Sequence, residues 1–527
     1  MSQPAADYLT IKAQEQPDKT ALIDDRPSGT RTVLTYAELE RRSCRVANAL
    51  LGEGLSQGER VLWCGCNSPG AVIMIHAARK AGLTAVPLNY RLTAEETVYV
   101  VDDSDAALIW VDAENAPLFS SIQLAESGNA LARVRRIVVY GGEAEGALPA
   151  ATVTDQEWLD GVSDRTPPPV AIHPKTMIYT SGTTGKPKGS VRDSTGDPEQ
   201  RRRLVEHIGY RPDDVYLTTG PLYHSGPGGF MAISYLLGNT VVLQRHFDPE
   251  DWLRLVDVHR VTSTFAAPTP IRRICALPPE VKARYDTRSM RIMIANAAPW
   301  PMALKRMVLA DFPADSLWEV YGSTELGVNM VLEPADQLRK PGSCGKPAPG
   351  VEVELIDDEG RPVTEPGVQG EVFVKSASVF DTYHKARDKY DADRRGEFHT
   401  VGDVATFDAE GYYYICDRKK DMIITGGMNV YPAEIEAALE EHPSIFEAAV
   451  FGIPSDEWGE SVHAVVVPVP GSDPTPEQVA AHAREHLAGY KIPRSISFAD
   501  ELPKTGSGKV LKRELRAPYW REAERRI

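Results

Sequence analysis

The chain has 527 residues, of which 42% are hydrophobic and 25% are charged, and its formal net charge is −16. This length allows roughly three units of about 150 residues and several hydrophobic cores. The negative charge argues against a general nucleic-acid binder or a protein of anionic membrane surfaces, because both targets select clustered Lys and Arg. It does not exclude small anionic ligands, since a single pocket can be basic on an acidic protein.

The first residues, the apolar pattern and the cysteines lead us to expect a cytoplasmic protein. The first residues lack the basic start and apolar stretch of a signal peptide, and no apolar run approaches the ~18 residues of a membrane span. The six cysteines are scattered, which fits a reducing compartment. Only Cys64 and Cys66 lie close together, and without His or Cys companions they are expected to be buried thiols rather than zinc ligands.

Helix and strand signals alternate over the first 150 residues. Thr35 with Glu38 and Thr93 with Glu96 form capping-box patterns, each followed by an expected helix. Residues 71–80 have a helical pattern that ends before Gly82. Strands are expected over 61–64, 107–111 and 136–140. Strands separated by helices predict an α/β domain of parallel sheets covered by helices.

The pattern changes twice further along the chain. A helix is expected from Asp248-Pro249 and a strand over 261–265, after which short strands split by turns over about 340–416 predict a small β-rich subdomain. The charged stretch 417–421 is the expected junction. The chain is therefore predicted to have a large domain over 1–418 and a small, mobile α+β domain over 419–527.

A hydroxyl-rich glycine loop follows the expected strand at 176–178. Residues 179–189 read Tyr-Thr-Ser-Gly-Thr-Thr-Gly-Lys-Pro-Lys-Gly. Glycine lets backbone N–H groups approach an anion, and the hydroxyl and lysine side chains add donors and positive charge. The spacing is not that of a Walker A loop, because Gly182 and Gly185 are three apart and Pro187 follows Lys186. The composition predicts a polyphosphate clamp.

This loop resembles the signature of the ANL superfamily of adenylate-forming enzymes, which contains the acyl- and aryl-CoA synthetases. Three further stretches match family motifs in the required order. They are Tyr-Gly-Ser-Thr-Glu at 321–325, Thr-Val-Gly-Asp with Asp-Arg-Lys-Lys-Asp over 400–421 and Gly-Gly-Met-Asn at 426–429, and Pro-Lys-Thr-Gly-Ser-Gly-Lys at 503–509. The resemblance covers nearly the whole chain.

The resemblance implies a set of residues that hold ATP. Asp403 and Arg418 are expected at the ribose, Thr324 at the α-phosphate, and Glu325 at Mg²⁺, a hard cation that favours carboxylate oxygens. The remaining expected nucleotide contacts are Thr180, Ser181, Gly182, Thr183, Thr184, Gly185 and Lys188 at the phosphates, and Asn296, Ala297, Ala298, Pro299, Tyr321, Gly322 and Ser323 around the adenine.

The resemblance also implies the chemistry. Lys509 is expected to bridge the substrate carboxylate and the α-phosphate, Lys420 to act as the hinge of the small domain, and His224 to lie near the carboxylate. Walls of the acid pocket are expected at Tyr223, Ser225, Gly226, Ala295, Trp300, Gly327 and Val328. The acid itself stays open among fatty acids, benzoates and cinnamates.

Coenzyme A is the expected acceptor of the acyl group. Nothing near His224 offers an anchoring carboxylate for an amino acid, and no carrier domain is expected after Ile527. The expected CoA contacts are Arg91, Gly426, Gly427 and Trp458. The alternatives are an enzyme that loads a carrier protein or stops at acyl-AMP, and an inactive homologue acting as a sensor or scaffold. The run Arg201 to Arg203 is expected to be solvated surface, and the oligomeric state stays open, a homodimer included.

Overall fold

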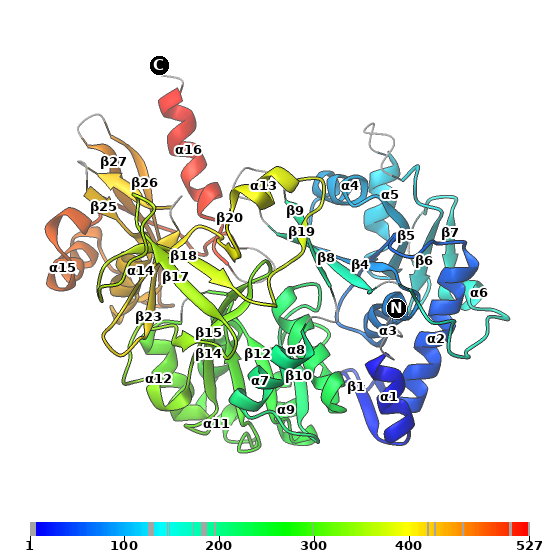
Figure 1. Ribbon diagram of the computed structural model, residues 1–527. Coiled ribbons are helices and arrows are strands. Elements are labelled where there is room, and N and C mark those ends of the chain that lie inside the picture. The colour runs from blue at the N-terminus through cyan, green and yellow to red at the C-terminus, as the bar shows by residue number, and fades with distance from the viewer. Residues whose placement is uncertain are drawn as a thin grey trace.

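The computed structural model describes residues 7–124, 131–144, 146, 148–171, 173–180, 187–193, 197–298, 300–418, 421–425, 428–455, 458–504 and 509–524. A large α/β domain is followed by a small α+β domain, which lies at one end of the molecule in orange and red (Figure 1). Within these ranges, no helix combines the length and apolarity that crossing a bilayer requires.

The first sheet of the large domain is parallel from β8 to β7, and β9 joins it antiparallel. Its strands run in the order β19 (Thr382–Tyr383), β9 (Lys188–Asp193), β8 (Lys175–Thr180), β4 (Thr84–Leu88), β3 (Arg60–Cys64), β5 (Ala106–Asp112), β6 (Arg136–Tyr140) and β7 (Thr152–Thr154). Its helices are α2 (Tyr36–Gly52), α3 (Pro69–Lys80), α4 (Ala94–Asp103), α5 (Pro117–Leu124) and α6 (Asp155–Trp158).

Alternation along β3 shows how helices cover both faces of this sheet. Leu62 and Cys64 pack in one cluster with buried residues of α4 and α5. Val61 and Trp63 point the other way and pack with α2 and α3. Because side chains alternate along a strand, a strand buried on both faces is apolar on both, as β3 is from Val61 to Cys64. The parallel architecture expected from the sequence is confirmed.

The second sheet is parallel from β1 to β14 and has antiparallel strands at both ends. Its order is β16 (Lys346–Pro347), β15 (Gly327–Leu332), β14 (Leu317–Ser323), β13 (Ile292–Ala295), β12 (Ser263–Ala266), β10 (Val215–Thr218), β11 (Thr240–Leu243), β1 (Thr20–Asp25) and β2 (Arg31–Thr35). The neighbouring helical segments are α1 (Tyr8–Glu15), α7 (Pro198–Ile208), α8 (Ser225–Leu237), α9 (Pro249–His259), α10 (Pro268–Cys275), α11 (Pro279–Lys282), α12 (Met302–Asp311) and η1 (Pro334–Asp336).

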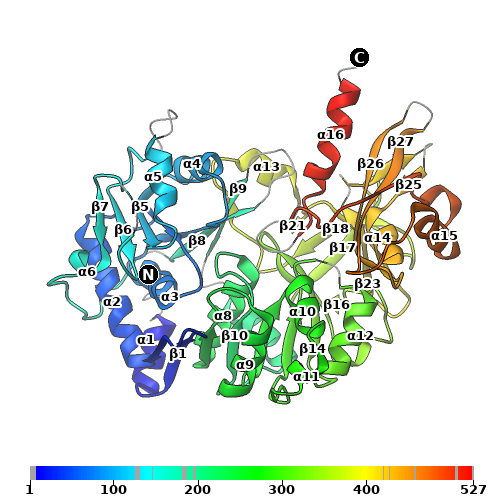
Figure 2. The same cartoon turned by 180° about the vertical axis from the view of Figure 1, so that it is seen from behind.

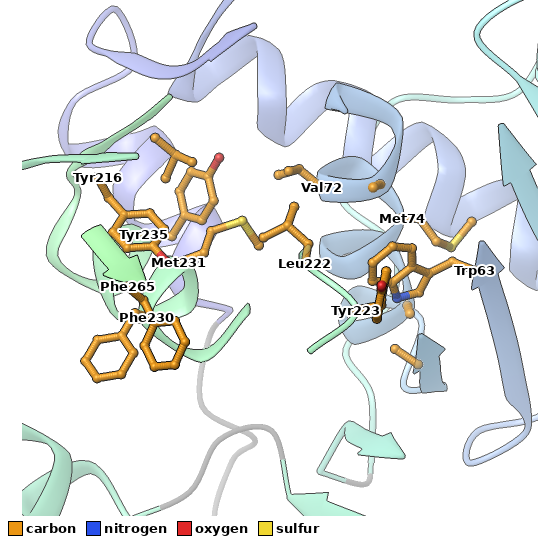
Figure 3. Packing of buried hydrophobic residues seen from close by; sticks show 14 of the residues in the cluster. Trp63, Val72, Met74, Tyr216, Leu222, Tyr223, Phe230, Met231, Tyr235 and Phe265 are labelled. Atoms are coloured by element: carbon orange, nitrogen blue, oxygen red, sulfur yellow. The ribbon is translucent and has the colours of Figure 1, made fainter. Parts of the chain in front are cut away.

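A single apolar core joins the two sheets (Figure 3). Trp63 on β3 and Val72 on α3 belong to the same buried cluster as Leu222, and as Phe230 and Tyr235 on α8. In Figure 3 these side chains form a continuous band between the elements of the two sheets. The band makes the two sheets one rigid support for the loops at their strand ends.

The β-rich subdomain and the small domain follow. The subdomain contains β17 (Glu352–Ile356), β18 (Gly370–Lys375), β20 (Arg394–Arg395), β21 (Phe398–His399), β22 (Asp403–Phe407), β23 (Tyr413–Arg418) and α13 (Arg387–Ala392). The small domain contains β24 (Ile423–Thr425), β25 (Met428–Val430), β26 (Ile445–Ser455), β27 (Gly459–Pro468), β28 (Ser495–Phe498), α14 (Pro432–Glu440), α15 (Pro476–His486), η2 (Gly489–Lys491) and α16 (Lys512–Glu524). Seen from behind, α16 projects away from the large domain (Figure 2).

The small domain has its own apolar core, made by residues of β24 to β27, α14 and α15. The boundary predicted between residues 418 and 419 stays a prediction, because residues 419 and 420 lie outside the described ranges.

Local signals in the sequence account for where helices begin. Both predicted capping boxes are confirmed: Thr35 and Thr93 accept a hydrogen bond from the backbone three residues on, and Glu38 and Glu96 reach back to the cap. Asp248 caps α9 as expected. Helix α3 ends as predicted before Gly82, whose φ of +69° is a conformation that glycine adopts without strain.

Candidate active site

A cavity of about 860 Å³ lies where the large and small domains meet. Ile178 on β8, Thr324 after β14 and His224 before α8 line it, and so does Lys509 of the small domain. Residues from four distant parts of the chain therefore converge on one space. Strand ends and a helix N-terminus supply the large-domain wall, the usual location of ligand sites in open α/β sheets.

The charges around this cavity are mostly positive. Among the described residues that line it, eight are Arg or Lys and three are Asp. They are Arg79, Arg91, Arg192, Arg201, Arg245, Arg273, Lys504 and Lys509 against Asp193, Asp197 and Asp381. A basic cavity in a chain of net charge −16 favours anionic small ligands, because the local field and not the net charge decides binding.

Glu325 is held in place by two hydroxyl groups. Its side chain is 8% exposed, and its Oε1 accepts hydrogen bonds from Thr180 Oγ1 at 2.8 Å and from the Tyr383 hydroxyl at 3.3 Å. Thr180 ends β8, directly before the glycine-rich loop, whose residues 181–186 lie outside the described ranges. Hard divalent cations prefer carboxylate oxygens as ligands, so the Glu325 carboxylate fits such a cation at the start of that loop.

Thr324 and its neighbours are fixed by a residue that sequence reasoning missed. The Arg192 guanidinium donates to the carbonyl oxygens of Thr324 at 2.6 Å and Glu325 at 3.1 Å, and also to that of Ser378. The Thr324 hydroxyl lies 2.8 Å from Ser225 Oγ. Burial lowers the pKa of Arg192, while the negative charges of Glu325 and Asp381 favour its charged form. Arg192 lies in β9, one residue before its end.

Tyr321 and Asp403 meet although they lie in different sheets. The Tyr321 hydroxyl donates to Asp403 Oδ2 at 2.5 Å, and Asp403 is 7% exposed. Asp403 also pairs in register with Arg418 across β22 and β23. The side chain of Arg418 lies outside what the structure describes. The aromatic ring and the carboxylate predicted for the adenine and the ribose are therefore neighbours.

Asn296 supports a strained turn beside Tyr321. Its amide donates to the carbonyl of Val320 at 2.5 Å, and its Oδ1 accepts from the backbone N–H of Ala297. Ala297 has a φ of +75°, a region that residues with a side chain enter at an energetic cost. The Asn296 carboxamide thus links this turn to β14. Glycine at position 297 would adopt the same φ without strain. Pro299 lies outside the described ranges.

Three of the residues predicted for the acid pocket lie behind its wall. Tyr223, Ala295 and Trp300 are at most 4% exposed, belong to the apolar cores and do not line the cavity. Burial of a bulky apolar side chain in the core is more favourable in free energy than exposure to a solvated cavity. The spacing of residues in the sequence cannot distinguish a core position from a position in the cavity wall. The predicted wall residues that do line it are Ser225, Gly226, Gly327 and Val328.

Glycines near His224 serve different purposes. A Cβ on Gly226 would meet the Phe265 ring at 2.2 Å, so this glycine permits close packing and does not leave room for a ligand. A Cβ on Gly229 would meet nothing within 4 Å, and Gly229 lines the cavity. Of these two glycines, only Gly229 offers space for an acyl or aryl group.

The residues predicted for CoA and for the hinge are spread out. Arg91 lines the cavity, whereas Trp458 does not and lies in the small domain under the Arg494 guanidinium, 4.1 Å from the ring centroid. Lys188 lies 5.9 Å from the Tyr383 ring centroid. Lys420, Gly426 and Gly427 lie outside the described residues.

Cys66 has two further neighbours, Glu114 and His246, whose ligand atoms lie within 4.8 Å of its own and of one another. Arg245 forms an ion pair with Glu114 at 2.6 Å, and burial raises the pKa of the Cys66 thiol to about 11. This environment favours a protonated thiol over a metal thiolate.

The family model for the AMP-binding enzyme matches residues 9–384, and that for the AMP-binding enzyme C-terminal domain matches residues 434–509. The chain belongs to the AMP-binding enzyme family. The family resemblance and the fold class expected from the sequence are confirmed. The two matches fall on the large and the small domain of this AMP-binding enzyme.

Relatives of this AMP-binding enzyme match along nearly its whole length. It is 37% identical to a feruloyl-CoA synthase of Amycolatopsis sp, over 96% of this chain and 97% of that protein. It is 34% identical to the fatty acid–[acyl-carrier-protein] ligase ScoC of Streptomyces coeruleorubidus, over 98% and 97%. The crystal structure of the anthranilate CoA ligase AuaEII in complex with anthranoyl-AMP superposes with a TM-score of 0.87 at 28% identity, over 97% and 96%.

Proposed function

We propose that the chain is an AMP-forming acyl-CoA synthetase. It converts a carboxylic acid and ATP into acyl-AMP and pyrophosphate, and then converts acyl-AMP and CoA into acyl-CoA and AMP. The observation that carries this proposal is the presence of Lys509, Thr324 and His224 around one basic cavity. The names of relatives such as the feruloyl-CoA synthase support CoA as the acceptor.

In the first half-reaction, an oxygen of the substrate carboxylate forms a bond to the α-phosphorus of ATP. The bond from that phosphorus to the leaving pyrophosphate oxygen breaks. Two anions must approach each other, so positioning and charge neutralisation provide most of the catalysis. Lys509 supplies a cation to the approaching carboxylate and phosphate. Thr324, held by Arg192 and Ser225, supplies a hydroxyl. Glu325, with Thr180 beside it, would hold Mg²⁺, whose charge offsets that of the phosphates.

In the second half-reaction, the thiol sulfur bonds to the acyl carbon, the carbon–oxygen bond to AMP breaks, and the thiol proton is released. The small domain is proposed to rotate about Lys420 between the two steps, moving Lys509 away from the cavity. No disulfide joins the six cysteines, all of which lie in the described ranges, and a cytoplasmic enzyme is part of the same proposal.

A second acceptor is favoured by one specific observation. The 34% identical ScoC protein is named as a ligase that acts on an acyl-carrier protein. Transfer to a carrier phosphopantetheine uses the same thiol chemistry as transfer to CoA, so the cavity fits both.

The test is a screen of carboxylic acids with the full-length chain, ATP and Mg²⁺, with and without CoA. We expect pyrophosphate release that depends on the acid, and a thioester together with AMP when CoA is added. Transfer to a holo carrier protein but not to CoA would establish the second acceptor. Absence of pyrophosphate with every acid would overturn the proposal and favour an inactive homologue.

A further inference from the structure

The cavity extends from Lys509 to a polar end that none of the expected site residues uses. Tyr8 on α1, His76 and Arg79 on α3, and Arg201 on α7 line it there. Arg201 is half-buried, whereas Arg202 and Arg203 are exposed and form ion pairs with Glu199. The expectation that all three arginines are solvated surface is therefore wrong for Arg201, because one face of α7 points into the cavity.

His76 closes this end as a buried group without a polar partner. It is 0% exposed, and neither of its ring nitrogens has a hydrogen-bond partner among the described residues. Its ring lies edge-on between those of Tyr8, at 5.7 Å, and Tyr235, at 4.9 Å. A buried polar group left unpaired is energetically costly, so such a group inside a cavity wall points to a ligand that pairs with it.

Two guanidinium groups stand beside this histidine. Arg79 lies 3.8 Å over the Tyr8 ring and 3.3 Å from Asp7, and its Nε is buried without a partner among the described residues. Arg201 interacts electrostatically with Arg79, Asp193 and Asp197, and within the described part of the chain its side chain forms no ion pair and no hydrogen bond. The polar end therefore offers hydrogen-bond donors, and an aspartate lies near each of the two guanidinium groups.

We propose that this end binds a hydroxyl group on the acid substrate, at the end remote from its carboxylate. The hydroxyl hydrogen would donate to a His76 nitrogen, and the hydroxyl oxygen would accept from Arg201. An alkyl end would pair with neither nitrogen of His76, and a second carboxylate, which only accepts hydrogen bonds, could not donate to the unprotonated nitrogen of His76. This inference rests on the proposed function, and it names hydroxylated acids as the substrate class.

The test compares acids that differ only at the remote end. Binding is measured by calorimetry, and pyrophosphate release in parallel, for cinnamate, 4-hydroxycinnamate and 4-carboxycinnamate, and for octanoate and 8-hydroxyoctanoate. We expect at least one hydroxylated acid to bind about tenfold or more tightly than its unsubstituted partner. Equal affinities within both pairs, or a preference for 4-carboxycinnamate, would overturn the proposal.

Variants assign the preference to this end of the cavity. Arg201→Leu is expected to reduce the hydroxyl preference at least about fivefold while the affinity for the unsubstituted acid changes little. His76→Phe is expected to act in the same way if it folds. Arg202→Leu, on the exposed face of the same helix, should leave the ratio unchanged. A preference untouched by Arg201→Leu would refute this location. Absence of pyrophosphate with a clear binding preference would instead overturn the proposed function alone.

Discussion

The Arg272 guanidinium on α10 of the large domain lies 3.2 Å from the Glu440 carboxylate on α14 of the small domain. Arg272 also donates to the carbonyl oxygen of Phe446 and lies 5.0 Å over its ring centroid. Burial raises the pKa of Glu440, and the charge of Arg272 opposes that rise. The contact joins the two domains in the arrangement in which Lys509 lines the cavity.

Arg272→Gln is therefore expected to weaken this arrangement. We predict that acid-dependent pyrophosphate release falls about tenfold, since coupling energies of this kind amount to about 1–3 kcal/mol. Thioester formation from supplied acyl-AMP should stay near the wild-type rate, because it uses the other orientation. Both half-reactions are measured separately. Arg288→Gln, an exposed arginine paired with Asp286, is the control. An equal loss in both half-reactions would argue against a role in domain orientation.

Lys509→Ala separates the two half-reactions more strongly. We expect pyrophosphate release to fall at least about 100-fold, because the cation facing the carboxylate and the α-phosphate is lost. Conversion of supplied acyl-AMP to thioester should persist. Lys512→Ala, which removes a lysine paired with Glu436 at 2.8 Å, should change neither rate. Normal pyrophosphate release by Lys509→Ala would show that the assignment is wrong.

The hydrogen bond from Tyr321 to Asp403 predicts an effect on ATP binding. Asp403→Asn removes the charge of a buried acceptor, and we expect KM for ATP to rise about 10–100-fold with a smaller change in kcat. Tyr321→Phe keeps the ring and removes only the hydroxyl, so its KM should rise less than that of Asp403→Asn. Steady-state kinetics over a range of ATP concentrations distinguish the two. Unchanged KM in both variants would exclude these residues from the nucleotide site.

Arg192 is expected to act by positioning Thr324 and Glu325. Arg192→Lys keeps a positive charge but cannot donate to three carbonyl oxygens in the same geometry. We predict a fall in kcat of about 10–100-fold with KM for the acid little changed, measured by pyrophosphate release. Arg202→Lys is the matched exchange on the surface. If kcat is retained, the contacts of Arg192 with the carbonyl oxygens do not order Thr324 and Glu325.

His76 predicts how stability depends on pH. Burial lowers the pKa of His76 to about 3, with Asp7 raising it and Arg79 and Lys80 lowering it, whereas unfolding returns it to about 6.5. The unfolded chain therefore binds an extra proton between these values, and the stability contribution present above pH 6.5 is lost as the pH falls. The free energy of unfolding should drop by about 2 kcal/mol from this residue between pH 6.5 and pH 4.5.

Denaturant unfolding of the wild type and His76→Phe at the two pH values measures this contribution. The variant should lose about 2 kcal/mol less than the wild type over the same interval. Identical losses in His76→Phe and the wild type would mean that the pKa of His76 does not differ between the folded and unfolded states.

The sequence by itself determined the secondary elements and the motifs of this protein. Capping boxes at Thr35 and Thr93, the apolar run of β3 and the hydroxyl-rich loop after β8 are local patterns, and each acts through residues only a few positions apart. Order and composition of such motifs were sufficient to recognise the family and to propose a role for Lys509.

Only the tertiary structure decided which side chains meet. Arg192, Arg201 and Arg272 resemble ordinary surface arginines in the sequence, yet one fastens the catalytic turn, one enters the cavity and one joins the domains. Trp300 and Tyr223 were expected in the pocket and lie in the core instead. The direction in which a side chain points depends on packing between segments distant in the chain, and no periodicity within a segment records that packing.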